Sequence, residues 1–245
     1  MPPGKHNFDL AAFFPLFSTY TYRLINDADS LTYTTLSVLR DFARDGVVYL
    51  ELRTTPRAMP AAGLTKADYV RVVLDTIARF ESEEEKFPGM HTRLILSIDR
   101  RNTLEEALET ASLAERFASQ GVVGLDLCGD PTVTDIAHLA PAFDVARRRR
   151  SGLGLTLHFA ETEGSGTEEE LRMLLGWEPD RLGHVIYVPG PVKEAIVKRG
   201  GAVGLELCLS CNVHAGMICG GFESQCVSHS LSLSLSLSLV RKLLP

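Results

Sequence analysis

Long hydrophobic runs are missing from this 245-residue sequence, and tryptophan occurs only once. The most apolar patch near the N-terminus, Phe13 to Phe17, is interrupted by Pro15. A membrane-spanning helix needs about 18 uninterrupted apolar residues, and no run approaches that length. The N-terminal residues also lack the charged, apolar and small-residue stages of a secretory signal. We therefore expect no membrane partner.

Cysteine is scarce, and its count of five is odd. A framework of paired disulfides is typical of small secreted domains, and an odd count in a longer chain argues against one. These features predict free thiols and a cytoplasmic protein.

A surplus of basic residues is also absent, since 25 Lys and Arg stand against 31 Asp and Glu. The resulting net charge of −6 disfavours nucleic acid and anionic membranes as partners. We interpret the short basic run Arg147 to Arg150 as a solvated helix end. We therefore expect a small molecule as the partner. The oligomeric state stays open.

From about residue 31 the chain alternates short apolar runs with segments of helical period, the pattern of a parallel α/β sheet. Thr103 with Glu106 and Thr167 with Glu170 have the spacing of capping boxes at helix starts. The length matches a (β/α)8 barrel of about 250 residues. The six expected strands are Val47–Thr54, Thr92–Asp99, Val122–Gly129, Gly154–Glu161, Arg181–Val185 and Ala202–Leu209.

Polar residues gather where these runs end, and the clearest case is the string LHFAE, Leu157 to Glu161. The active sites of parallel barrels lie at the carboxyl ends of the strands. His158 can serve there as a neutral imidazole ligand, and Glu161 as a proton donor. The next run places His184 at the adjacent strand end. Taken alone, each residue also suits a structural role.

Together these motifs resemble the adenosine deaminase superfamily, and within it the adenosine-deaminase-like branch that acts on adenosine or N6-methyl-AMP. The similarity runs from about Leu36 to Asn212. It is carried by DGVVYLELRTTPR, SIDRR, GLDLCGDP, LHFAE, DRLGH and LELCLSCN in that order.

The resemblance implies a role for particular residues. His158 matches a zinc ligand, Glu161 the acid that protonates purine N1, and His184 the histidine that orients a zinc-bound hydroxide. The implied reaction is zinc-dependent hydrolytic deamination of adenosine or N6-methyl-AMP, with inosine or IMP as product. The implied substrate-binding residues are Thr55, Pro56, Arg57, Asp99 and Gly129, of which the first three correspond to the phosphate-holding loop.

The sequence departs from the family at both ends. The His-x-His pair of the family's first strand is missing, with only His6 nearby, and so is the Asp-Asp pair of the eighth strand. Only His158 of the expected zinc ligands is present, and one imidazole does not hold catalytic zinc. We expect an incomplete (β/α)8 barrel of the metal-dependent hydrolase type, with strands two to seven present and strands one and eight missing. We also expect two apolar sheet edges prone to aggregation, and no deamination by this chain.

The last residues follow a different pattern, because Ser230–Leu239 alternates strictly between serine and leucine. A simple dinucleotide repeat read in triplets encodes such a string, and we hypothesise that this tail is a translated repeat from non-coding sequence or a faulty gene model. We expect a partial deaminase-like domain over 1–214 and a low-complexity tail over 215–245.

Two other interpretations stay open, and a third conflicts with the sequence. A cytidine-deaminase-type zinc site needs a carboxylate two residues after its histidine and a proline before its C-x-x-C, and this chain has neither. A purine-binding pseudo-enzyme would keep the base-contacting residues without turnover. A Cys-rich structural zinc module would use Cys208, Cys211, Cys219 and Cys226 with His214 or His229.

Overall fold

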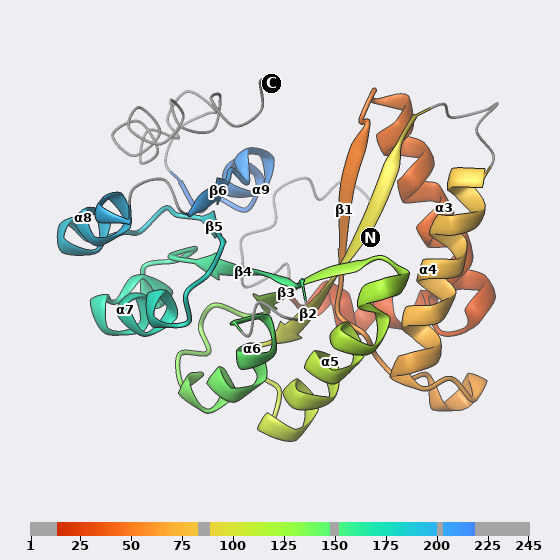
Figure 1. Cartoon of the computed structure of the whole chain (residues 1–245), viewed down its shortest axis with the longest axis horizontal. Coiled ribbons are helices and arrows are strands. Elements are labelled where there is room, and N and C mark those ends of the chain that lie inside the picture. The colour runs from red at the N-terminus through yellow and green to blue at the C-terminus, as the bar shows by residue number, and fades with distance from the viewer. Residues whose placement is uncertain (1–13, 83–88, 148–151, 200–202, 219–245) are drawn as a thin grey trace.

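A computed structural model describes residues 14–82, 89–147, 152–199 and 203–218. Its centre is one six-stranded sheet in which neighbouring strands are parallel and follow the chain order β1-β2-β3-β4-β5-β6. Figure 1 shows the sheet curling from β1 and β2 round to β5 and β6. The strands are β1 (Tyr49–Thr54), β2 (His91–Asp99), β3 (Val122–Cys128), β4 (Gly154–Phe159), β5 (Arg181–His184) and β6 (Gly204–Glu206).

Helices connect the strands and cover the outer face of the curled sheet (Figure 1). The outer helices are α3 (Ala28–Arg44), α4 (Lys66–Ser82), α5 (Leu104–Phe117), α6 (Ala140–Arg147), α7 (Glu168–Gly176) and α8 (Gly190–Lys198). The remaining helical turns are η1 (Phe17–Thr21), α2 (Tyr22–Leu24), η2 (Pro60–Ala62), η3 (Ala118–Gln120), η4 (Ala137–Leu139), η5 (Gly164–Gly166) and α9 (Leu209–His214).

The expected helix caps are half right. At the start of α5, the Glu106 amide donates to the Thr103 hydroxyl and the Glu106 carboxylate accepts from the Thr103 amide, so this capping box is confirmed. At the start of α7, the Glu170 amide donates to the Thr167 hydroxyl. The Glu170 carboxylate does not return to the cap, because it pairs with buried Arg100. The second predicted box is therefore only partly right, because the predicted hydrogen bond from the Thr167 amide to the Glu170 carboxylate is not made.

The core lies between the sheet and the outer helices. Its largest fully buried aliphatic residues include Leu96, Ile98, Leu125 and Leu127 of β2 and β3. The single tryptophan, Trp177, stacks on Phe143 of α6 with ring centroids 4.9 Å apart. Burying aromatic and aliphatic surface in this layer supplies most of the driving force for folding.

The sheet is the predicted incomplete barrel, with β1 and β6 as its two edges. One detail differs from the expectation. The last strand covers only Gly204–Glu206, and Cys208 lies beyond it as the N-cap of α9. Apolar side chains are exposed at both edges, among them Tyr49 of β1 and Leu207 just after β6, while charged side chains of β1 and β6 are directed toward each other, as described below.

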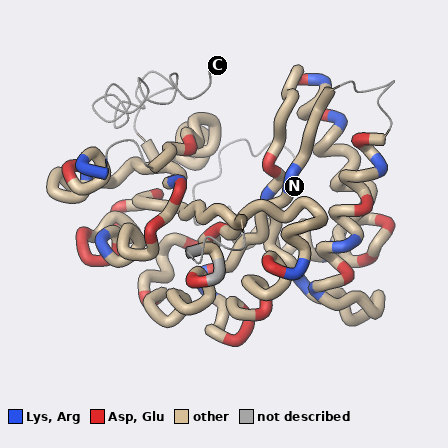
Figure 2. The backbone as a smooth tube through the Cα atoms, in the orientation of Figure 1, with Lys and Arg blue, Asp and Glu red and all other residues tan. Residues whose placement is uncertain are grey.

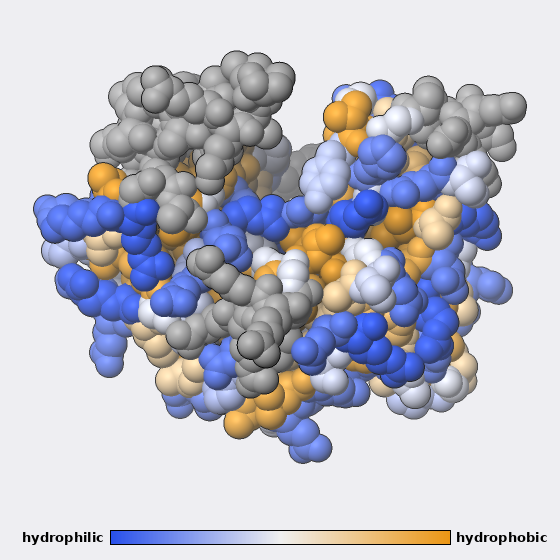
Figure 3. Space-filling view, viewed as in Figure 1, coloured by the Kyte–Doolittle hydropathy of each residue, from blue (hydrophilic) through white to orange (hydrophobic). Residues whose placement is uncertain are grey.

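The outer surface is mixed in charge and hydropathy. Figure 2 shows acidic and basic residues interspersed along the outer helices. Figure 3 shows a largely hydrophilic face with hydrophobic side chains at the projecting end of β1 and β2. Val48, just before β1, is 68% exposed. Among the helices of the described ranges, none has the length and apolar character needed to cross a membrane.

Candidate active site

Two cavities open at the carboxyl ends of the strands. The larger has a volume of about 320 Å³ and includes Arg53, Thr55 and Arg57 in its lining. The smaller has a volume of about 200 Å³ and is called the base pocket, after the purine base that the family resemblance implies. It is lined by Phe14, Phe17, Tyr22, Thr55, Asp99, Arg101, Cys128, Gly129, His158, Glu161, His184 and Cys211. The structure thus brings His158, Glu161, His184, Asp99 and Gly129 into one cavity, as the strand-end pattern predicts.

His158 comes from β4 and is oriented by the neighbouring strand β3. Its Nδ1 lies 2.8 Å from the Leu127 carbonyl oxygen and 3.1 Å from Asp126 Oδ1. Both partners accept, so Nδ1 carries the proton and Nε2 keeps a free lone pair. Burial disfavours the charged ring, but the charge and hydrogen bond of Asp126 outweigh it and raise the pKa of His158.

His184 and Glu161 form a buried pair in the base pocket. His184 Nε2 lies 3.6 Å from Glu161 Oε1, and His184 Nδ1 lies 2.8 Å from Asn212 Oδ1 on α9. Burial lowers the pKa of His184, but Cys208 and the Glu161 carboxylate outweigh burial and raise it. The His184 ring is also 5.3 Å from the His158 ring between centroids. The imidazoles of His158 and His184 and the carboxyl of Glu161 are therefore close enough to contact the same small ligand.

The backbone at these strand ends is strained. Ala160, His184 and Val185 have φ of 51°, 64° and 55°, in the left-handed region that side chains with a Cβ rarely adopt. Ala160 directly precedes Glu161, and its carbonyl accepts from the amides of Ile186 and Tyr187. Such strain persists where surrounding contacts enforce it, and it clusters at functional sites.

Asp99 and Gly129 meet on the opposite side of the pocket. Gly129 has a φ of 103°, and a Cβ there would lie 2.5 Å from Asp99 Oδ1, so only glycine fits. Asp99 is engaged by Arg101, whose Nε donates to Oδ1 at 2.8 Å and whose Nη2 donates to Oδ2 at 2.6 Å. A ligand group reaching Asp99 therefore meets a guanidinium as well as a carboxylate.

The loop after β1 contributes unequally to the two cavities. Thr55 lines both, Arg57 lines the larger one, and Pro56 is buried without lining either. The Arg57 guanidinium lies 4.9 Å from the centre of the Tyr22 ring, and its Nη2 donates to the Tyr22 carbonyl at 3.4 Å. Its charged group is thereby held at the cavity mouth by a cation–π contact.

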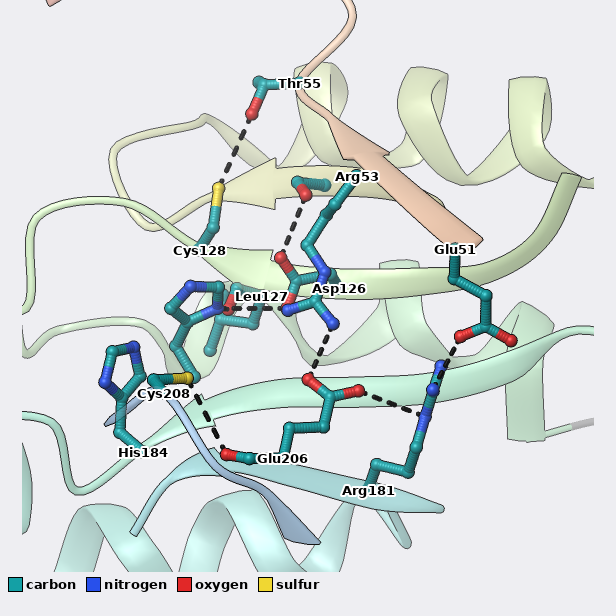
Figure 4. Close-up of polar contacts among 12 residues, drawn as sticks. Glu51, Arg53, Thr55, Asp126, Leu127, Cys128, Arg181, His184, Glu206 and Cys208 are labelled. Carbon is teal, nitrogen blue, oxygen red and sulfur yellow. Dashed lines mark hydrogen bonds and ion pairs between the residues drawn. The ribbon is translucent and has the colours of Figure 1, made fainter. Parts of the chain in front are cut away.

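Two groups of residues at the site were not predicted: the aromatic side chains that line the cavities, and a set of charged side chains, called the charged floor. The charged floor consists of Glu51, Arg53, Asp126, Arg181 and Glu206. Phe17 and Tyr22 line both cavities from η1 and α2, a segment without helical apolar period. Figure 4 shows Arg53 directed toward Asp126 and Glu206, and Arg181 toward Glu51 and Glu206. The sequence signal for these residues is the alternation in β1, where Glu51 and Arg53 are separated by an apolar residue.

The charged floor stabilises the orientation of His158 through Asp126. Asp126 is fully buried, and it accepts from Ser97 Oγ at 2.9 Å and from Arg53 Nη1 at 3.4 Å. Burial opposes its ionisation, but the His158 ring, Arg53 and Ser97 outweigh burial and hold the pKa of Asp126 below its usual value. An ionised Asp126 is the partner that the Nδ1–H of His158 requires.

A match to the adenosine deaminase family model extends over residues 3–220. The chain belongs to the adenosine deaminase family. Among curated relatives, it is 39% identical over 195 residues to "N6-Methyl-AMP deaminase-L" of Xenopus laevis, a match covering 78% of this chain and 54% of that protein. The human N6-methyl-AMP deaminase is 36% identical over 208 residues, covering 82% and 56%. The chain thus spans about half the length of these relatives.

A solved structure gives the same assignment. The ADAL–IMP complex superimposes with a TM-score of 0.82 at 31% identity, covering 94% of this chain and 66% of that one. The neighbours of this adenosine deaminase family member therefore include one in which IMP is bound.

Adenosine deaminases are typically metal-dependent, so the donor set here requires a test. Across the described ranges, no three His, Cys, Asp or Glu side chains converge to hold a metal ion. His158 Nε2 is a single suitable donor, and catalytic zinc needs three protein ligands. The described residues therefore do not fit a complete zinc site. His6, Cys219, Cys226 and His229 lie outside the described residues, while Cys208 and Cys211 are free thiols.

Proposed function

We propose that this chain carries the base-holding and proton-transferring part of a hydrolytic deaminase site for an adenine nucleotide, N6-methyl-AMP before adenosine. The pair Glu161–His184 in the base pocket carries the proposal, because it places a carboxyl and an imidazole together at the carboxyl ends of β4 and β5. The nucleotide preference is supported by Arg57 at the cavity mouth and by the IMP bound to a relative.

In this proposal the residues divide the work by position. Glu161 donates a proton to purine N1, which makes C6 more electrophilic, and His184 exchanges a proton with the attacking water. Asp99 and the Gly129 backbone contact the base from the other side, and Arg57 pairs with the phosphate. Among the described residues, His158 is the group best placed to hold zinc, which would activate the water when bound. We propose that the chain alone binds nucleotide without turnover, because its described donors do not complete that site.

Calorimetry on the 245-residue chain with IMP and inosine tests the binding part. We expect Glu161→Gln to weaken IMP binding about tenfold, and Glu163→Gln, an exposed carboxylate two residues away, to leave it unchanged. Arg57→Met should weaken IMP more than inosine. Wild-type protein that folds yet releases no heat with IMP would contradict the proposal.

The missing turnover has its own test. Purified chain supplied with zinc is assayed for loss of N6-methyl-AMP and adenosine, and we expect no product. Zinc-dependent product formation would overturn this part and leave the binding part intact. The cytoplasmic location remains a prediction, which localisation of the tagged full chain would check.

A further inference from the structure

A fully buried ion pair lies outside both cavities, next in sequence to Asp99 of the base pocket. Arg100 Nη2 lies 2.8 Å from Glu170 Oε1, and the two side chains are only 2% and 4% exposed. Arg100 directly follows Asp99 at the end of β2, and Glu170 lies in the first turn of α7. Neither residue lines either cavity.

Arg100 lies in the segment after β2 and contacts the segments that follow β3 and β4. Its Nη2 donates to the carboxylate of Glu170, which lies beyond the loop after β4. Its Nη1 donates at 2.9 Å to the carbonyl of Val133, which lies in the loop after β3. Its own amide donates to the Cys128 carbonyl at 2.8 Å. These loops carry Glu161 and Gly129, and Arg100 itself extends the loop of Asp99. One guanidinium therefore connects three of the segments that line the base pocket.

Stability alone does not account for this pair. Burying two charges removes their hydration, and well-packed apolar residues of similar volume are often as stable or more stable. The arrangement is also incomplete, because Glu170 Oε2 is buried without a hydrogen-bond partner among the described residues. A planar guanidinium, by contrast, fixes two acceptors in defined directions, which apolar packing does not.

We infer that Arg100 and Glu170 are positioning residues that hold the Glu161 loop in register with the loops of Asp99 and Gly129. The pair sets the distance across the base pocket without touching the base. This inference rests on the proposed function for its effect on binding, but its effect on the loops is independent of that function.

The test replaces the pair by apolar residues of similar length, in Arg100→Met/Glu170→Met. The matched control is Arg172→Met/Glu168→Met, which removes an exposed ion pair from the same helix, with N and O 2.7 Å apart. We expect both variants to fold, and amide exchange in 130–136 and 160–167 to accelerate about tenfold only in the buried variant. IMP affinity should fall about tenfold in that variant and stay at the wild-type value in the control.

A second readout separates positioning from a merely structural role. Glu161→Gln is introduced both into the wild type and into Arg100→Met/Glu170→Met. If the pair positions Glu161, the loss of IMP affinity caused by Glu161→Gln is at least about threefold smaller in the second background. Wild-type loop exchange, with the full Glu161→Gln effect retained, would overturn the inference. Absence of IMP binding by the wild type would refute the proposed function alone, because the exchange comparison still decides the inference.

A variant that keeps the charge covers the case in which the double variant does not fold. Arg100→Lys preserves the ion pair with Glu170 but lacks the fork that also reaches Val133. We expect exchange in 130–136 to accelerate about threefold, with 190–198 of α8 unchanged. Exchange in 130–136 equal to the wild type would then overturn the inference.

Discussion

Arg53 on β1 and Glu206 on β6 form an ion pair of 2.6 Å, although these strands are the two edges of the sheet. The sheet curls far enough that side chains 153 residues apart in sequence meet in its interior. Arg181 joins the same carboxylate to Glu51, so the edges are connected twice. These charged side chains, which no sequence motif predicted, thus help to hold the curled shape.

Removing this cross-edge contact should destabilise the fold. In Glu206→Gln, Arg53 and Arg181 lose their shared counter-charge, and we expect the free energy of unfolding to fall by about 1–3 kcal/mol. Glu194→Gln is the control, because Glu194 pairs with Lys198 at 3.8 Å on an exposed helix face. Its effect should stay within about 0.5 kcal/mol. Urea denaturation compares the variants, and equal losses would refute a special role for the cross-edge pair.

The capping box of α5 should make part of the stability pH-dependent. The backbone hydrogen bond from Thr103 lowers the pKa of Glu106 in the folded chain. A carboxyl with a lowered folded pKa stabilises the fold above its unfolded pKa, and this contribution disappears as pH falls. The free energy of unfolding of the wild type should exceed that of Glu106→Ala by about 0.5–1 kcal/mol at neutral pH. This difference should disappear below about pH 4.3. Urea midpoints across this range measure the gap; a constant gap would contradict the assignment.

The hydrogen-bond partners of the two histidines fix their tautomers. Nδ1 of His158 faces the Asp126 carboxylate and the Leu127 carbonyl, and Nδ1 of His184 faces the Asn212 amide oxygen. Nitrogen NMR of the neutral rings should therefore show protonated Nδ1 and unprotonated Nε2 in both. Asn212→Ala should mix the tautomers of His184 and leave His158 unchanged. A protonated Nε2 on His158 would be inconsistent with the geometry.

Gly129 should tolerate no side chain. Gly129→Ala combines a left-handed backbone with a Cβ 2.5 Å from Asp99, and displaces the carboxylate that Arg101 binds. We expect a loss of about 1–3 kcal/mol in unfolding free energy. Gly152→Ala is matched in backbone conformation, with φ of 68°, but its Cβ would meet nothing within 4 Å, so it should lose only about 1 kcal/mol. Thermal denaturation of both variants separates the collision from the backbone effect.

The strands were the most predictable part of the fold. Five of the six apolar runs match observed strands to within about two residues at each end, because alternating strands and helices leave a clear apolar rhythm. The exception is the last run, which shortens to Gly204–Glu206 at the sheet edge. The strand-end residues of the base pocket were also predictable, since parallel strands bring their carboxyl ends together.

The remaining features depend on tertiary structure that no local pattern encodes. Glu170 has the spacing of a capping residue, but Arg100 binds its carboxylate from another loop. Phe17 and Tyr22 reach the cavities from a segment whose turns carry no amphipathic signal. The division at residue 214 and the origin of the serine–leucine repeat stay predictions. Transcript sequencing across the codons for 212–220 tests the repeat, because continuous coding support would refute translation of a non-coding repeat.

The left-handed residues at the ends of β4 and β5 matter for protein engineering. Ala160 and Val185 both sit where glycine would relieve backbone strain, so glycine there is an obvious route to a more stable scaffold. Glycine would also widen the range of conformations open to the segments next to Glu161 and His184. Selection for thermal stability alone would therefore favour changes at the positions whose rigidity the proposed binding site needs. Stabilised variants of this scaffold should be screened for ligand affinity at every round.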